Sequence, residues 1–85
     1  SSDYPAYEED DRLQQQTWLL SQALSTLPAE EVMLLRMKYE QQMDIHQIAT
    51  QLKLTQSAVK MRLKRTRDKV RLVCQQLTSR LFFLA

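Results

Sequence analysis

The sequence predicts an all-α protein, a four- to five-helix orthogonal bundle that ends in a long C-terminal helix. Apolar residues recur at the three- and four-residue spacing of a buried helix face in several segments, and no segment alternates strictly between apolar and polar residues as a strand would. The chain has 85 residues, of which 44% are apolar, a composition typical of one small globular domain. We expect this domain to span residues 10–85, and residues 1–9 to form an acidic linker or tail.

The first helix is expected from about Asp10 to Leu24. Acidic residues stand in its first turn, where the helix dipole favours negative charge. Its predicted buried stripe is Leu13, Leu20, Leu24 and then Leu27, flanked by Trp18.

Pro28 separates the first helix from the second. The residue before a proline disfavours the helical region, whereas proline itself suits the first position of a helix. Glu30 and Glu31 follow it in the first turn, and the helix is expected to run to about Tyr39. Its predicted inner face is Val32, Leu35 and Tyr39, with Met33 and Met37 beside it.

Residues 44–67 contain two helical segments on either side of a three-residue break. The first has one apolar face, made by Ile45, Ile48, Ala49 and Leu52. Asp44 precedes the first segment and Thr55 the second, where their side chains can cap free N–H groups. Lys53 and Leu54 form the turn, with Leu54 as an apolar plug. This is the pattern of a helix-turn-helix, whose second helix enters the major groove of DNA.

The last helix meets no stop signal for many residues, so we expect a single helix from about Gln56 to Arg80. Its inner stripe is predicted to be Val59, Leu63, Thr66, Val70, Val73 and Leu77. The tip, Phe82-Phe83-Leu84, is expected to cover the first helix as part of the core. An exposed docking patch at this tip is the alternative.

Basic charge is concentrated at the carboxyl end of the chain. Residues 53–85 contain nine Lys or Arg and one Asp, a net charge of +8, whereas residues 1–27 carry −4 and residues 28–52 carry −2. One strongly basic helix indicates a polyanionic partner, because a merely solvated face more often mixes the two signs.

Catalysis and metal binding have little support in the sequence. Cys74 is the only cysteine, so neither an internal disulfide nor a cysteine-based zinc site can form. His46 is the only histidine and falls on the outer face of its helix without a partner arrangement. Glu30 and Glu31 are explained by stabilisation of a first turn rather than by acid–base chemistry. We therefore expect no enzyme, no cofactor and no metal.

Membrane insertion is not expected either. The longest apolar run, residues 81–85, is far shorter than the roughly 20 residues that a membrane span needs. The acidic amino end does not resemble a signal peptide. We expect a cytoplasmic protein.

The outward face of the last helix supplies the candidate DNA contacts. At 100° per residue, Ser57, Met61 and Lys64 lie about 140–200° from Val59 and would face the groove. Lys and Arg can recognise guanine, Gln can recognise adenine, and a helix N-terminus suits a phosphate. The candidate DNA-binding residues are Thr55, Gln56, Ser57, Ala58, Lys60, Met61, Arg62, Lys64 and Arg65.

Three stretches of this sequence resemble region 4 of bacterial RNA polymerase sigma factors. Residues 27–36, from Leu27-Pro28 to Leu35-Arg36, resemble its opening motif. Residues 44–49 resemble the first helix of its helix-turn-helix, and residues 54–67 its recognition helix. The resemblance extends over about residues 27–72. It is strongest to the small sigma factors of the extracytoplasmic-function group, in which an acidic, proline-containing linker precedes region 4.

The resemblance implies sequence-specific binding to the −35 promoter element, as part of a sigma factor that directs RNA polymerase to initiate transcription. It also implies contact with the flap of the polymerase β subunit and capture by an anti-sigma factor. The sequence departs from the family pattern at three places, one of which is Ser57-Ala58, where Gly-Thr is frequent. Lys53 stands where glycine is usual, which predicts a positive φ at a cost of about 1 kcal/mol. Met61 replaces a small serine, which predicts an altered base preference.

Two alternatives remain at this point. One is a protein-docking module, in which the last helix and its Phe82-Phe83 tip engage a partner. The other is the output domain of a response regulator with the same helix-turn-helix. The acidic linker and the helix that follows Leu27-Pro28 favour the sigma factor interpretation.

Overall fold

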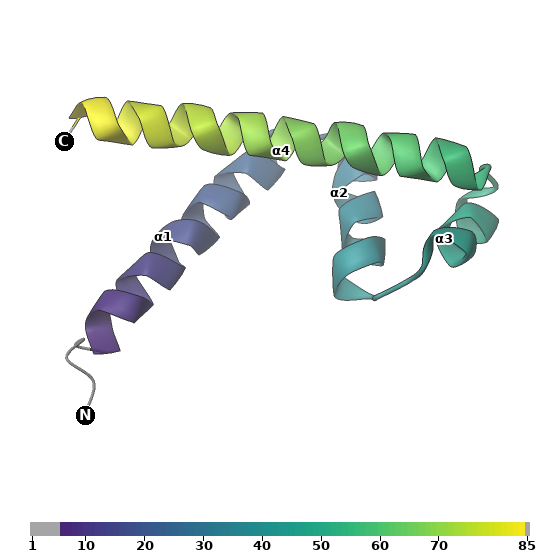
Figure 1. Ribbon diagram of the computed structural model, residues 1–85, viewed down its shortest axis with the longest axis horizontal. Coiled ribbons are helices and arrows are strands. Elements are labelled where there is room, and N and C mark those ends of the chain that lie inside the picture. The colour runs from purple at the N-terminus through teal and green to yellow at the C-terminus, as the bar shows by residue number, and fades with distance from the viewer. Residues whose placement is uncertain (1–5, 85) are drawn as a thin grey trace.

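The computed structural model describes residues 6–84, with side chains for residues 10–80 (Figure 1). It contains α1 (Ala6–Ser25), α2 (Ala29–Leu35), the π-helical turn η1 (Arg36–Glu40), α3 (Ile45–Leu52) and α4 (Gln56–Leu84). No strand occurs in this part of the chain. The predicted all-α class, with a helix-turn-helix and a long C-terminal helix, is confirmed. No helix of the described residues is both long enough and apolar enough to cross a bilayer.

Helix α4 is the longest helix, and it runs along most of the length of the molecule. Its 29 residues span about 43 Å, close to the longest extent of 49 Å. The other helices all lie along one side of it in Figure 1. The radius of gyration is 16.4 Å, against about 12 Å for a compact domain of this length. The chain is therefore elongated, and only part of α4 is covered.

The core lies where α2, η1 and α3 meet the first half of α4. Its buried apolar residues are Leu34, Met37, Ile48, Ala49, Val59 and Leu63. The partly buried residues packed against them include Ile45, Leu52 and Leu54. The predicted inner faces of α3 and of the start of α4 are thus confirmed, as is the role of Leu54 as a plug. Thr66 is also buried, on the predicted stripe of α4.

The face that α2 and η1 present to the core agrees with the predicted one at Leu35, which packs against the core, and differs from it at other positions. Leu34 and Met37 are buried, whereas Met33 and Tyr39 are exposed. The predicted inner position of Tyr39 is wrong. Helix α2 is apolar on two faces, and the one that contains Leu34 meets α3 and α4. Pro28 also differs slightly, because it is the N-cap of α2 rather than its first residue.

The end of α2 widens into η1. Gln41 N–H donates to Arg36 O at 2.8 Å, and Met43 N–H donates to Met37 O at 2.9 Å. These wide-turn hydrogen bonds, with Gln42 at a positive φ of 56°, end the helix and direct the chain toward α3. Residues 41–43 thus connect η1 with the N-cap of α3.

Helix α1 packs on α4 only through its last turns. Ala23 is fully buried, Leu19 and Leu24 are half-buried, and Cys74 Sγ of α4 lies 3.9 Å from Leu19 O. The predicted stripe is wrong at Leu13 and Leu20, which are exposed. The amino-terminal half of α1, which contains Leu13, diverges from α4 in Figure 1 and has no surface to pack against. Leu20 lies in the other half and lines an open groove between α1, α2 and α4.

The two ends of the chain differ from the predicted helix bounds. Helix α1 begins at Ala6 rather than near Asp10, and α4 continues to Leu84 rather than ending near Arg80. The division between a linker and a domain at residues 9 and 10 stays a prediction. The packing of Phe82 and Phe83 concerns side chains outside the described residues.

Candidate nucleic-acid interface

A capping box fixes the start of α3. Gln47 N–H donates to Asp44 Oδ1 at 2.7 Å, and Asp44 N–H donates to Gln47 Oε1 at 2.9 Å. Each side chain satisfies a backbone N–H of the other residue, an arrangement that sets where the helix begins. The predicted capping role of Asp44 is confirmed.

The turn between α3 and α4 requires a left-handed residue. Lys53 has φ 57° and ψ 44°, the positive φ that the resemblance predicts from the glycine usual at this position. Leu54 N–H then donates to Ala49 O at 2.9 Å, which closes the turn and directs the Leu54 side chain to the core. The two helices are held at a fixed angle by local hydrogen bonds and one apolar contact.

Thr55 caps α4. Its Oγ1 accepts a hydrogen bond from Ala58 N–H at 3.1 Å, and its carbonyl accepts one from Val59 N–H at 3.1 Å. The hydroxyl hydrogen of Thr55 is still free to donate to a phosphate oxygen. This geometry preserves the combination of a hydroxyl and a helix N-terminus that suits an anion.

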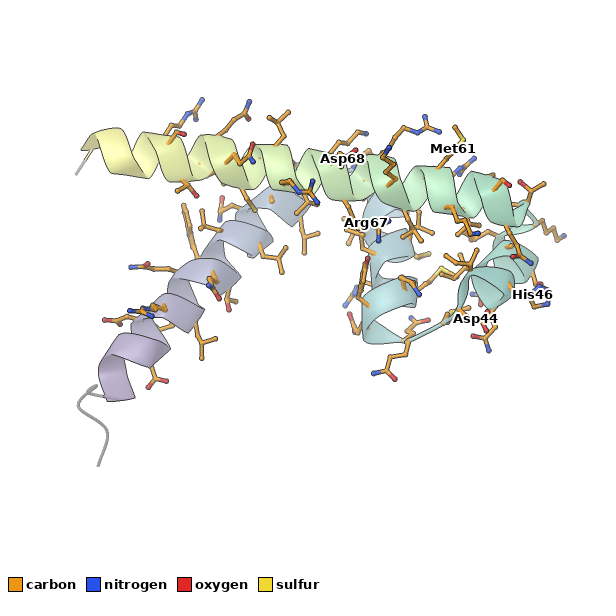
Figure 2. The ribbon with its side chains drawn as sticks, viewed as in Figure 1. Asp44, His46, Met61, Arg67 and Asp68 are labelled. Carbon is orange, nitrogen blue, oxygen red and sulfur yellow. The ribbon has the colours of Figure 1, made fainter. Side chains whose placement is uncertain are left out.

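The predicted outward face of α4 is open to solvent. Val59 and Leu63 are 0% and 1% exposed, whereas Ser57, Met61 and Lys64 on the other side are exposed. Met61, with 60% of its surface exposed, projects away from α2 and α3 (Figure 2). Ala58 is half-buried, so it is the least accessible of the candidate residues.

The cations of α4 divide into two groups. The hydrogen bonds and ion pairs of the described residues do not engage the first group, Lys60, Arg62, Lys64 and Arg65. The second group is engaged by the protein itself. Arg67 donates to Tyr39 Oη at 2.8 Å, Lys69 Nζ lies 2.6 Å from Glu31 Oε1, and Arg71 lies 3.9 Å from Asp68. The unpaired cations of the first group therefore lie on the first half of α4, which is the second helix of the helix-turn-helix. Arg80, near the other end of α4, belongs to neither group.

Two grooves flank α4. One, between α2, α3 and α4, places Arg62 and Arg65 together with Glu30 and Glu31. The other, between α1, α2 and α4, is lined mainly by apolar side chains and has a volume of about 720 Å³. Its lining residues are Leu20, Leu24, Val32, Leu35, Tyr39 and Val70, with Arg36, Glu40, Arg67 and Arg71 around them.

His46 was not among the candidate interface residues predicted from the sequence. The structure places its Nδ1 3.3 Å from Nε2 of Gln56, the first residue of α4. The ten-residue separation across a helix-turn-helix is the only signal that could have suggested this contact. The described residues contain no group of three His, Cys, Asp or Glu side chains that could hold a metal.

Comparison with models of known protein families gives a match. The family model described as "Sigma-70, region 4" matches residues 23–72, which contain α2, η1, α3 and the first half of α4. No curated protein matches the chain. The matched segment includes the capped helix-turn-helix, the unpaired cations and the whole buried core.

Proposed function

The chain belongs to the sigma-70 region 4 family, and from this membership we propose that it binds the −35 element of promoters. In this role it would direct RNA polymerase to initiation sites as part of a sigma factor. Family membership supports DNA binding rather than catalysis. We further propose that the domain belongs to the extracytoplasmic-function group, as residues 1–12 and the Leu27-Pro28 junction suggest, and that it acts in the cytoplasm.

One observation carries the proposal. The second helix of the helix-turn-helix presents unpaired cations around an outward face, while Arg67, Lys69 and Arg71, further along α4, are engaged by the protein. Lys64 and its neighbours can bind phosphates or the guanine edge, and Met61 can contact the methyl group of thymine. The N-terminus of α4, with the Thr55 hydroxyl, suits one phosphate.

The test is DNA binding measured as a function of salt and sequence. With about four to six phosphate contacts, log K should fall against log[salt] with a slope of roughly −4 to −5. Lys64→Ala should weaken the preferred site by about 1–3 kcal/mol and blur the preference at one base position. Lys60→Ala and Arg65→Ala should do so to a lesser degree.

Arg80→Ala is the matched control. It removes an exposed cation from the same helix, about 24 Å beyond Lys64. If Arg80→Ala and Lys64→Ala weaken all DNA sequences equally, α4 is a general basic surface and the proposed recognition is wrong. If the affinity for DNA did not change with salt concentration, the proposed contacts between these cations and phosphates would be wrong.

The apolar groove between α1, α2 and α4 supports a protein partner as well. Region 4 family membership implies interaction with RNA polymerase. An apolar groove of this kind fits the apolar face of an amphipathic helix. The surrounding Arg36, Arg67 and Arg71 favour acidic residues along the edge of that helix. We propose that the polymerase β flap, or an anti-sigma factor when the protein is inactive, occupies this groove.

A further inference from the structure

The contact between His46 and Gln56 joins the two helices of the helix-turn-helix at the end where α4 begins. Both side chains are exposed, and Nε2 of Gln56 lies 3.3 Å from Nδ1 of His46. His46 lies at the same end of the molecule as the start of α4 in Figure 2. Each backbone is fixed by a neighbouring cap, Asp44 for α3 and Thr55 for α4. The pair is therefore held together before any ligand binds.

We infer that His46 is a positioning residue that sets the orientation of the Gln56 amide for base recognition. The inference rests on the proposed DNA-binding function. A glutamine recognises adenine through two opposite groups, because Oε1 accepts from N6 while Nε2 donates to N7. An unrestrained amide can turn over and exchange those groups. The hydrogen bond to His46 uses one N–H of Nε2 and leaves the other N–H and Oε1 available.

The proton on the imidazole decides which way the amide points. A neutral ring can accept from Nε2 at Nδ1, but in a protonated ring both nitrogens donate. The amide must then turn so that Oε1 faces His46, which leaves only N–H donors for DNA. Preference at this base position should move from adenine toward bases that present acceptors, such as guanine. The added positive charge should also strengthen binding to any sequence.

The pH response can be assigned to His46, because it is the only histidine of the chain. Histidine is the side chain that normally changes charge between pH 5 and 8. No ion pair of the described residues includes His46. Asp44 and Lys53 flank α3, and η1, which packs against it, carries Arg36, Lys38 and Glu40. The charged groups of α4 are Lys60, Arg62, Lys64, Arg65, Arg67, Asp68, Lys69, Arg71 and Arg80.

The experiment selects preferred sites from a randomised DNA library with the unmodified chain and its variants, at pH 7.5 and pH 5.5 and constant salt. Gln56→Ala identifies the base position that Gln56 reads, as the position whose preference disappears. At pH 7.5, His46→Ala should reduce preference at that position about fivefold, the value of one hydrogen bond, and change the other positions little. Acidification should change the preference of the unmodified chain at the same position.

His46→Asn supplies the matched control, because its side-chain oxygen can accept from Nε2 but does not titrate. It should keep the preference at pH 7.5 and lose the dependence on pH. In the Gln56→Ala background, His46→Ala should change nothing further, since the two residues act as one unit.

Three outcomes would overturn the inference. They are an unchanged base preference in His46→Ala, independent losses from the two alanine variants, and a pH response retained in His46→Asn. Absence of any base preference in the unmodified chain is a different result, because it would overturn the proposed function and this inference together. Circular dichroism of each variant separates a local effect from unfolding.

Discussion

Met61 is the clearest case of a single residue that the fold does not explain. It is a large apolar side chain with 60% of its surface exposed, in the centre of a basic face. The core would be unchanged without it, so a contact with a ligand is the simplest reason for its presence. Exposed methionines of this kind adapt to the surface that they meet.

We expect Met61→Ser to change base preference more than overall affinity. The substitution removes apolar contact but no charge, so the phosphate contribution and its salt slope should stay the same. Library selection with the two proteins at one salt concentration measures the preference, and a salt titration measures the slope. Equal preference in the two proteins would mean that Met61 does not contact a base.

Lys69 and Arg71 differ in a way that the sequence did not predict. The structure pairs Lys69 with Glu31, whose side chain is only 26% exposed and whose Oε2 is buried without a hydrogen-bond partner. Arg71 pairs with Asp68 at 3.9 Å, and both of these side chains are well exposed.

Lys69→Ala should therefore lower the free energy of unfolding by about 1–2 kcal/mol, because it leaves a partly buried carboxylate without its partner. Arg71→Ala should change it by less than about 0.5 kcal/mol, as expected for an exposed pair. Urea denaturation measures both. Adding Glu31→Gln to Lys69→Ala should recover part of the lost stability. Equal losses for Lys69→Ala and Arg71→Ala would contradict the expectation that the Lys69–Glu31 pair stabilises the fold more than the Arg71–Asp68 pair.

At the level of the elements, the sequence predicts best where the signal is local. The capping residues Asp44 and Thr55 were identified correctly, because each is determined by its immediate neighbours. The left-handed Lys53 was also identified correctly, but from the family resemblance, in which glycine is usual at this position. The faces of α1 and α2 were predicted less well. Both helices have apolar residues on more than one side, so the choice of buried face depends on distant elements. Leu20 and Tyr39 are exposed for this reason.

The candidate interface also combines features set by local sequence with features that depend on distant elements. The outward face of α4 follows from helical periodicity and was predicted correctly as exposed. The contact of His46 with Gln56, and the pairing of Lys69 with Glu31, depend on the angles between helices. Periodicity within one helix contains no information about those angles.

The turn residue Lys53 provides a test at this scale. We expect Lys53→Gly to raise the free energy of unfolding by roughly 0.5–1 kcal/mol, because glycine adopts a φ of 57° without steric cost. Lys53→Ala is the control, since it removes the same charge and stem but keeps the Cβ atom. The difference in denaturation midpoint between these two variants isolates the backbone effect. A glycine variant no more stable than the alanine variant would show that the turn is not strained.

At the level of the whole molecule, two separate surfaces lie at different places along α4. The unpaired cations occupy the segment of α4 between Lys60 and Arg65, and the apolar groove meets α4 further along, at Arg67, Val70 and Arg71. Under the proposed function, DNA and a protein partner would bind to different parts of α4 and at the same time. Substitutions should affect one activity without the other.

Leu20→Asp tests this separation, because Leu20 lines the groove and is 48% exposed. A buried charge at the contact should weaken retention of the chain by core RNA polymerase about tenfold. The affinity for DNA and its salt slope should stay unchanged.

Leu13→Asp is the matched control, since Leu13 is 60% exposed on the same helix but does not line the groove. Lys64→Ala should give the opposite result, weaker DNA binding with normal retention. Equal loss of retention for Leu13→Asp and Leu20→Asp would place the polymerase contact outside this groove.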